Sequence, residues 1–89
     1  MTYDVTWSRQ AKRALSVELP EPVAAACLQF VLGPLAENPY RVGKPLREPQ
    51  RGLFAARRGE FRIIYEIKQD RLVVHVVVIR HRRDAYRPG

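Results

Sequence analysis

The longest regular pattern of apolar and polar positions predicts a β-hairpin over residues 61–79. In its first arm, 61–67, apolar side chains alternate with mostly polar ones, as in a strand with one buried face. The second arm, 72–79, is apolar on both faces apart from His75, which indicates a central strand covered on both sides. A cationic tract, 80–87, follows at once. We therefore expect the functional residues at this end of the sheet.

Shorter patterns predict the other elements. They are a half-buried strand at 3–7, a helix at 9–19 capped by Ser8, a second helix from about 22 to 32 with a looser turn to 37, a proline- and glycine-rich connection at 41–52, a short strand at 53–58 and a turn at 59–60. This β-α-α-β-β-β order predicts a small α+β fold, in which an antiparallel four-stranded sheet packs against an N-terminal helical hairpin. The tail, 82–89, is expected to add one short turn.

Length and composition predict one domain, 1–89. No stretch approaches the roughly 20 apolar residues of a membrane span, and the amino terminus lacks the layout of a secretion signal, so we expect a cytoplasmic protein. The single cysteine, Cys27, lies in an apolar helical segment. We expect it to be a core side chain rather than a reactive thiol.

The net charge of +7 is unevenly distributed. Residues 1–40 carry three basic and four acidic side chains, a net −1, whereas residues 41–89 carry thirteen basic and five acidic ones, a net +8. The second half is therefore expected to bind a polyanion. Nucleic acid is the leading candidate, and an anionic membrane surface and an acidic protein are the alternatives.

Several kinds of catalytic site are not expected. The two histidines, His75 and His81, are predicted to point to opposite faces of the strand and have no carboxylate cluster beside them, so neither a metal nor another cofactor is predicted. No serine or cysteine has a base placed to activate it. The five glycines are isolated turn residues rather than a phosphate-binding loop.

The remaining arginine, histidine and tyrosine side chains suit cleavage of RNA. The ribose 2′-hydroxyl is then the nucleophile, so the protein must hold the phosphate, stabilise its growing charge and move two protons. Arg62, on the polar face of the first hairpin arm, is the best candidate for the phosphate, and a plain surface arginine is the alternative reading. His81 suits proton transfer near neutrality, and Tyr86 suits base stacking or proton donation.

Two other stretches offer phosphate contacts. Lys44 and Arg47 lie in the long connection and can contact phosphate. The alternative reading of this segment is a solvated crossover whose Leu46 lies in the core. In the last strand, if it continues so far, Arg80 and Arg82 share one face and His81 lies on the other. A solvated turn is the alternative for the closing residues.

Three tracts carry a resemblance to a known family. They are Gly43-Lys44-Pro45-Leu46-Arg47, the segment from Gly52 to Tyr65, and His81-Arg82-Arg83-Asp84-Ala85-Tyr86-Arg87. With them, residues 3–87 resemble the RelE/ParE toxin superfamily, and its RelE branch in particular. The resemblance implies a toxin of a bacterial type II toxin–antitoxin pair with a microbial-ribonuclease-like fold. Such a toxin cuts messenger RNA in the ribosomal decoding site without a metal and is silenced by a RelB-type antitoxin.

The resemblance also implies partners and site residues. Ribosomal RNA is an expected contact, operator DNA is contacted only through the antitoxin, and no membrane partner is implied. Arg62 matches the family's phosphate-stabilising arginine, Arg82 (or, in an ungapped match, Arg80) its second arginine, and Tyr86 its carboxy-terminal aromatic residue. The implied catalytic set is Arg62, His81, Arg82 and Tyr86, and the RNA-binding set is Lys44, Arg47, Arg57, Arg58, Arg80 and Arg83.

The chain departs from the family on the strand before the hairpin. Lysines are usual there, whereas this sequence reads Phe54-Ala55-Ala56, with Arg57 and Arg58 as the only nearby substitutes. Either proton transfer has moved to His81 and Tyr86, or the ribosome contributes more, or the chain is a weak nuclease.

Two other function classes stay open. A ParE-like inhibitor of DNA gyrase has the same fold and acts by protein binding, so it predicts a DNA-damage response with intact messages. A non-catalytic nucleic-acid-binding module predicts salt-dependent RNA binding without toxicity.

Overall fold

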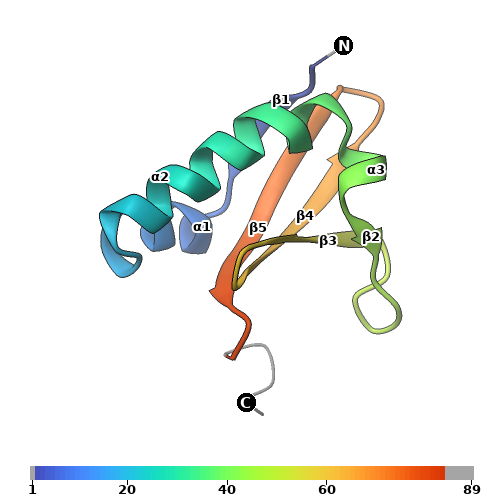
Figure 1. Ribbon diagram of the computed structural model, residues 1–89. Helices are drawn as coiled ribbons and strands as arrows, with labels where there is room; N and C mark the ends of the chain where they lie inside the picture. Colours follow the sequence, from blue (N-terminus) through green and yellow to red (C-terminus); the bar gives the residue numbers. More distant parts are fainter. Residues whose placement is uncertain (1, 84–89) are drawn as a thin grey trace.

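Helices lie against a five-stranded β-sheet in the computed structural model, which describes residues 2–83 (Figure 1). The strands are β1 (Asp4–Trp7), β2 (Lys44–Pro45), β3 (Leu53–Arg58), β4 (Phe61–Lys68) and β5 (Val73–His81). The helices are α1 (Arg9–Arg13) with its π-helical continuation η1 (Ala14–Glu18), α2 (Glu21–Phe30) with its continuation η2 (Val31–Leu35), and α3 (Pro39–Val42). The predicted α+β class is confirmed. Within the described range, no helix is long and apolar enough to cross a membrane.

The strand order is β1-β5-β4-β3-β2. β3, β4 and β5 form the predicted antiparallel meander, and β5 has a neighbour on each side. The sheet differs from the predicted antiparallel four-stranded one in two details, because β1 pairs with β5 in parallel and the two-residue β2 adds a fifth strand beside β3. An edge position suits β2, since Pro45 has no N–H to donate to a further strand.

The helical layer begins as the sequence predicts. The hydroxyl of Ser8 accepts a hydrogen bond from the Ala11 N–H and caps α1. The second helix widens into a π-helical turn around Pro34, which has no N–H for a regular helical bond. Helix α3 was not predicted, because Asn38 and Pro39 looked like the end of the helical part. Instead, Pro39 occupies the first turn of a new helix, where its missing N–H has no cost.

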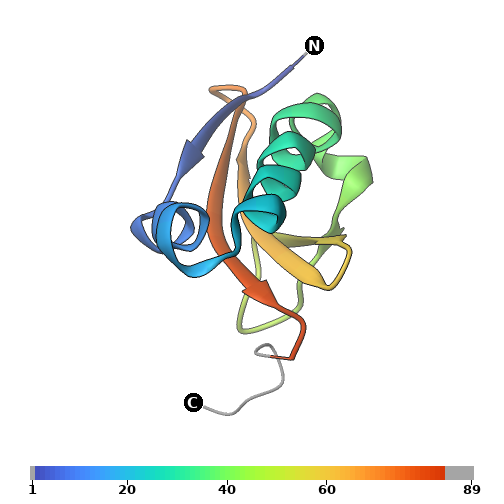
Figure 2. The same ribbon diagram turned by 60° about the vertical axis from the view of Figure 1, so that its left-hand side comes forward.

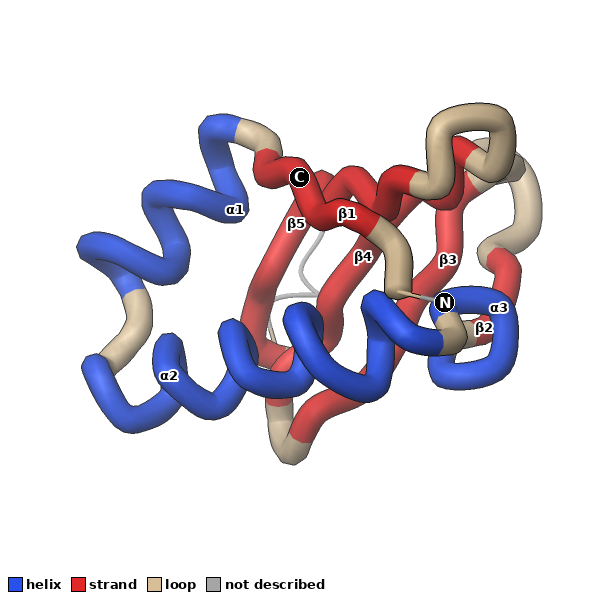
Figure 3. Tube along the Cα trace, turned by 90° about the horizontal axis from the view of Figure 1, so that it is seen from above, coloured by secondary structure: helices blue, strands red, loops and turns tan. Residues whose placement is uncertain are grey.

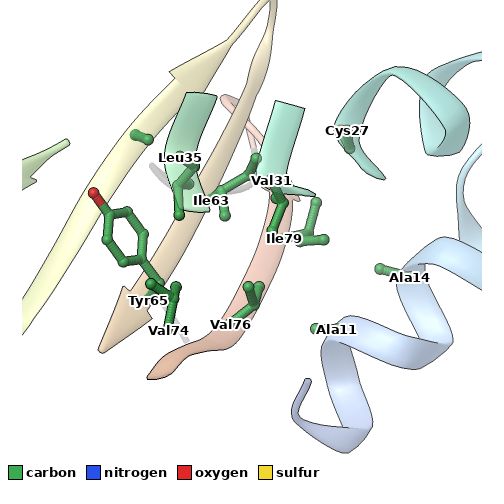
Figure 4. Packing of buried hydrophobic residues seen from close by; sticks show 11 residues of the cluster. Ala11, Ala14, Cys27, Val31, Leu35, Ile63, Tyr65, Val74, Val76 and Ile79 are labelled. Atoms are coloured by element: carbon green, nitrogen blue, oxygen red, sulfur yellow. The ribbon is translucent and has the colours of Figure 1, made fainter. Parts of the chain in front are cut away.

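The core lies between the helices and one face of the sheet (Figure 4). On the sheet side it contains the predicted dry positions Ile63 and Tyr65 of β4, together with side chains of β5. Cys27 is buried in the same cluster, as expected for a core residue. Figure 3 shows α2 running along the sheet, with α1 beside the end formed by β1 and β5.

A β-bulge in β5 decides which side chains reach which face. Ile64 pairs with Val78 and Tyr65 with Val76, so Val77 has no partner on β4. The hydroxyl of Ser8 donates a hydrogen bond of 2.5 Å to the carbonyl oxygen of Val77 and so links the start of α1 to the bulge. The extra residue reverses the alternation of the strand beyond it.

The bulge explains where the two histidines lie. His75 pairs with Glu66 before the bulge, and His81 pairs with Phe61 after it. They lie on opposite faces, as predicted, but only because of the bulge: in an unbroken strand, residues six positions apart share a face. β5 then ends at His81, beside the β3–β4 turn and away from the amino terminus (Figure 2).

Candidate nucleic-acid interface

Three arginines form a row across the face of the sheet that points away from the helical core. Arg57 of β3 pairs with Arg62 of β4, which in turn pairs with Arg80 of β5. Directly paired residues of antiparallel strands share a face, with Cβ atoms about 4.5–5.5 Å apart. We call Arg57, Arg62 and Arg80 the arginine row. It crosses the three central strands near the β3–β4 turn, where Gly59 has the left-handed φ of 61° that a tight turn requires.

The arginine row lacks counter-charge within residues 2–83. The ion pairs of this range involve other side chains, such as Lys68 with Glu66 and Arg71 with Asp70. No carboxylate of the range is within 4.0 Å of a nitrogen of the arginine row. Like charges directly opposite one another destabilise a sheet. The row is therefore a candidate anion-binding site.

A groove with a volume of about 470 Å³ adjoins the arginine row. It is lined by Val42, Lys44, Leu46, Ala55, Ala56, Arg57 and Arg62. Lys44 of β2 pairs with Ala55 of β3, so it lies beside the strand where the family resemblance led us to expect lysines. Leu46 lines this groove rather than filling the core, which corrects one of the readings of the long connection.

The edge of the groove is fixed by Tyr65. Its buried hydroxyl donates a hydrogen bond of 2.5 Å to the carbonyl oxygen of Pro39, at the start of α3. Burial raises the pKa of Tyr65 to about 12, although a hydrogen bond from the Gly43 N–H acts in the opposite direction. Tyr65 is therefore a neutral structural donor near pH 7.

Glycine is required where the chain turns from α3 into β2. A Cβ atom on Gly43 would lie 2.1 Å from the Tyr65 hydroxyl oxygen and 3.0 Å from the carbonyl oxygen of Ala55. No other residue fits without displacing one of these groups. The close approach holds Val42 and Lys44, on either side of Gly43, at the edge of the groove.

His81 does not face the groove. It pairs with Phe61 on the helix side of the sheet, and the two rings meet edge-on with centroids 5.2 Å apart. Its Nδ1 accepts a hydrogen bond of 3.1 Å from the Arg83 N–H, so in this arrangement the proton is on Nε2. Nε2 lies 3.4 Å from a carboxylate oxygen of Glu60. The structure therefore does not bring His81 to the arginine row.

The remaining predicted residues are spread over several positions. Arg82 and Arg83 follow the end of β5 and are exposed, and the Arg82 N–H donates to the carbonyl oxygen of Glu60 at 2.7 Å. Arg58 pairs with Phe61 and so lies on the helix side. Arg47 is exposed in the loop between β2 and β3. The predicted role of Tyr86 lies outside the described residues.

Sequence patterns located part of this interface. The arginine row and Lys44 were all named as candidates, with Arg80 as the ungapped alternative to Arg82, and the structure pairs Arg62 directly with Arg80. Val42 and Ala55 were not named as parts of a site. Nothing in the local pattern marks an alanine on a strand as part of a groove.

The chain is similar in sequence to toxins of bacterial toxin–antitoxin systems. Residues 5–86 match the family described as "ParE toxin of type II toxin-antitoxin system, parDE". The chain is 46% identical over 85 residues to Toxin RelE of Mycobacterium tuberculosis, which covers 96% of this chain and 87% of that protein. It is 41% identical over 87 residues to Toxin RelG of the same organism, which covers 98% and 99%.

Solved structures give the same comparison in three dimensions. The toxin–antitoxin complex RelBE2 of Mycobacterium tuberculosis matches with a TM-score of 0.86 at 38% identity, over 91% of this chain and 99% of that one. Escherichia coli toxin RelE, solved in the free state as a double arginine-to-alanine mutant, matches with a TM-score of 0.74 over 96% and 88%. Its identity of 19% supports a shared fold alone.

Proposed function

The chain belongs to the ParE toxin family of type II toxin–antitoxin systems and is a toxin of the RelE type, and on this premise we propose that it is a ribosome-dependent endoribonuclease. It cuts messenger RNA in the cytoplasm without a metal and thereby inhibits translation. The observation that carries the proposal is the arginine row, three cations in direct register on one face of the sheet. Within residues 2–83, none of the three forms an ion pair with a carboxylate.

The proposed reaction needs little covalent chemistry from the protein. The ribose 2′-hydroxyl attacks the neighbouring phosphorus atom, and the 5′-oxygen of the next nucleotide leaves. Negative charge grows on the non-bridging phosphate oxygens as the attack proceeds. Arg62 and Arg80 remain protonated and can each donate two hydrogen bonds to these oxygens, which stabilises the transition state. Arg57 extends the cationic row to the neighbouring phosphate and helps to align the RNA.

Lys44 takes over part of the task of the lysines that β3 lacks. It lies opposite Ala55 and lines the groove that contains Arg57 and Arg62. The group that accepts the proton of the 2′-hydroxyl is not assigned to the arginine row, since arginine does not give up its proton near neutrality. The roles of His81, Arg82 and Tyr86 in proton transfer and charge stabilisation stay predictions. A group of the ribosome is the alternative acceptor of the 2′-hydroxyl proton.

We propose a RelB-type antitoxin as the protein partner, by analogy with the relative solved as a toxin–antitoxin complex. An antitoxin segment that carries carboxylates can neutralise the arginine row and exclude RNA from it. Leu28 and Leu32 in the helical layer are 39% and 51% exposed and offer apolar surface to the same partner. Contact with operator DNA is then indirect, through the antitoxin.

The test is primer extension on translated messages after induction of the wild-type chain, of Arg62→Ala and of Arg71→Ala. Arg71 is the matched control, because it is an exposed arginine that pairs with Asp70 in the β4–β5 turn. We expect codon-phased cleavage with the wild type and the control, and none with Arg62→Ala. Full toxicity of Arg62→Ala would place the site elsewhere.

The same experiment separates the other function classes. Intact messages with a DNA-damage response would favour a gyrase inhibitor. Absence of toxicity together with salt-sensitive RNA binding would favour a binding module without catalysis.

A further inference from the structure

The groove beside the arginine row is lined by two kinds of side chain. Lys44, Arg57 and Arg62 are cationic, whereas Val42, Leu46 and Ala55 are aliphatic. A phosphate group needs only the cationic side chains. A nucleotide, with an anionic phosphate and a flat base whose faces are weakly hydrated, matches both.

The size of the groove is also that of a small-ligand site. Its volume of about 470 Å³ falls within the range of roughly 300–1,000 Å³ that is typical of small-molecule pockets. The groove lies on an open face of the sheet, so a single nucleotide of a longer strand can enter it while its neighbours continue over the surface.

The small side chain at Ala55 keeps the groove open. Alanine is a poor strand former, and most strand positions favour larger side chains. The adjacent Ala56 is 3% exposed and belongs to the core, so its small size has a packing explanation. Ala55 is only half-buried and faces the groove instead. Space for a ligand explains its size.

The part of the lining around Gly43 is held in place without a ligand. Tyr65 bonds to Pro39 and packs against Gly43, which fixes the chain on either side of Val42 and Lys44. Behind this corner, the ring of Phe54 stacks on that of Tyr65 with centroids 5.8 Å apart. A groove whose backbone is already fixed loses less conformational entropy when it binds a ligand, which favours affinity.

We infer that this groove is a nucleotide-binding subsite, in which the phosphate lies among Lys44, Arg57 and Arg62 and the base lies against Val42, Leu46 and Ala55. The inference rests on the proposed function and adds to it the position of a base next to the phosphate that is cut. Because Val42, Leu46 and Ala55 carry no side-chain hydrogen-bonding group, they distinguish bases by their size rather than by their edges.

The inference is tested by calorimetric titration of the purified chain with AMP, GMP, CMP and UMP, and with ribose 5-phosphate as the probe that lacks a base. We expect the best nucleotide to bind about tenfold more tightly than ribose 5-phosphate, because the base buries apolar surface. Equal binding of ribose 5-phosphate and all four nucleotides would overturn the inference.

Two variants locate the base. Ala55→Leu fills the groove and is expected to reduce nucleotide binding to the level of ribose 5-phosphate, while binding of ribose 5-phosphate itself is retained. Leu46→Ala removes part of the aliphatic lining without filling the groove and is expected to reduce the preference for nucleotides over ribose 5-phosphate, which keeps the test valid if Ala55→Leu does not fold. Ala25→Leu on the exposed side of α2 is the matched control and should change neither affinity. Unchanged nucleotide preference in the groove variants would contradict the inference.

These titrations are independent of cleavage. If nucleotides bind as expected but messages stay intact on induction, the proposed function fails and the subsite stands. If messages are cut but the chain shows no preference for a nucleotide over ribose 5-phosphate, only the subsite fails.

Discussion

Arg62 on β4 and Arg80 on β5 lie directly opposite each other on the same face of the sheet. Two cations in this position repel each other, and within residues 2–83 no carboxylate pairs with either one. In the proposed function, a phosphate bound between them would remove the repulsion.

Replacing Arg80 with glutamine is expected to increase the free energy of unfolding by about 0.2–1 kcal/mol at low salt, because one of the two facing charges is removed. The gain should shrink at high salt, where the charges are screened. Urea unfolding at both salt concentrations measures it. Arg71→Gln, which breaks an ion pair with Asp70, is the control and should give no gain. A less stable Arg80→Gln variant at both salt concentrations would contradict the expected repulsion.

Gly43→Ala is expected to decrease the free energy of unfolding by about 1–3 kcal/mol, because the new methyl group displaces the buried Tyr65 hydroxyl from Pro39. Urea unfolding also measures this change. The control is the same substitution in a Tyr65→Phe background, where the oxygen at 2.1 Å is absent. Gly43→Ala should decrease the free energy of unfolding less in that background. Equal decreases in the two backgrounds would show that the Tyr65 hydroxyl is not the obstacle.

Alkaline pH is expected to weaken the fold through Tyr65. Its pKa is raised from 10.0 to about 12, so between these values the folded chain holds a proton that the unfolded chain has lost. Stability contributed by this group is fully present below pH 10 and is lost as the pH rises through about 12, a decrease of roughly 2–3 kcal/mol. Unfolding followed from pH 8 to pH 12 should show the decrease in the wild type. In Tyr65→Phe the decrease in the free energy of unfolding should be smaller by the contribution of Tyr65. An identical decrease in both proteins would contradict the assignment of this contribution to Tyr65.

Substitutions of His81 separate proton transfer from positioning. The hydrogen bonds of His81 to Arg83 and Glu60 hold the chain as it leaves β5. Asparagine can accept and donate similar bonds but cannot transfer a proton near neutrality. If His81 only positions the chain after β5, His81→Asn should keep most of the toxicity that His81→Ala loses. Complete loss in both variants, assayed by growth after induction, would support the predicted proton transfer.

Local patterns were sufficient for the hairpin and for the start of α1. Alternation at Phe61, Ile63 and Tyr65 placed these side chains in the core and Arg62 on the other face, because a strand has a period of two. Ser8 was recognised as a helix cap because its hydroxyl can satisfy a free N–H at a helix start. These features depend on residues close together in the sequence.

Other features depend on contacts that a local pattern does not contain. The parallel pairing of β1 with β5 joins residues such as Val5 and Val74, far apart in the chain. The bulge lies in the run Val76-Val77-Val78, where all three side chains are apolar and no alternation marks the unpaired residue. The groove forms only when Lys44 of β2 lies beside Ala55 of β3.

The unpaired Val77 also affects how this strand should be aligned with those of its relatives. Chains that differ by one residue in the valine run present opposite sets of side chains after it, so an alignment without a gap equates residues on different sides of the sheet. In this chain, pairing of all residues without the bulge would place Ile79 instead of Arg80 opposite Arg62, whereas deletion of Val77 would leave Arg80 there. Positions beyond the run are therefore equivalent by the direction in which they face, not by their count from the hairpin.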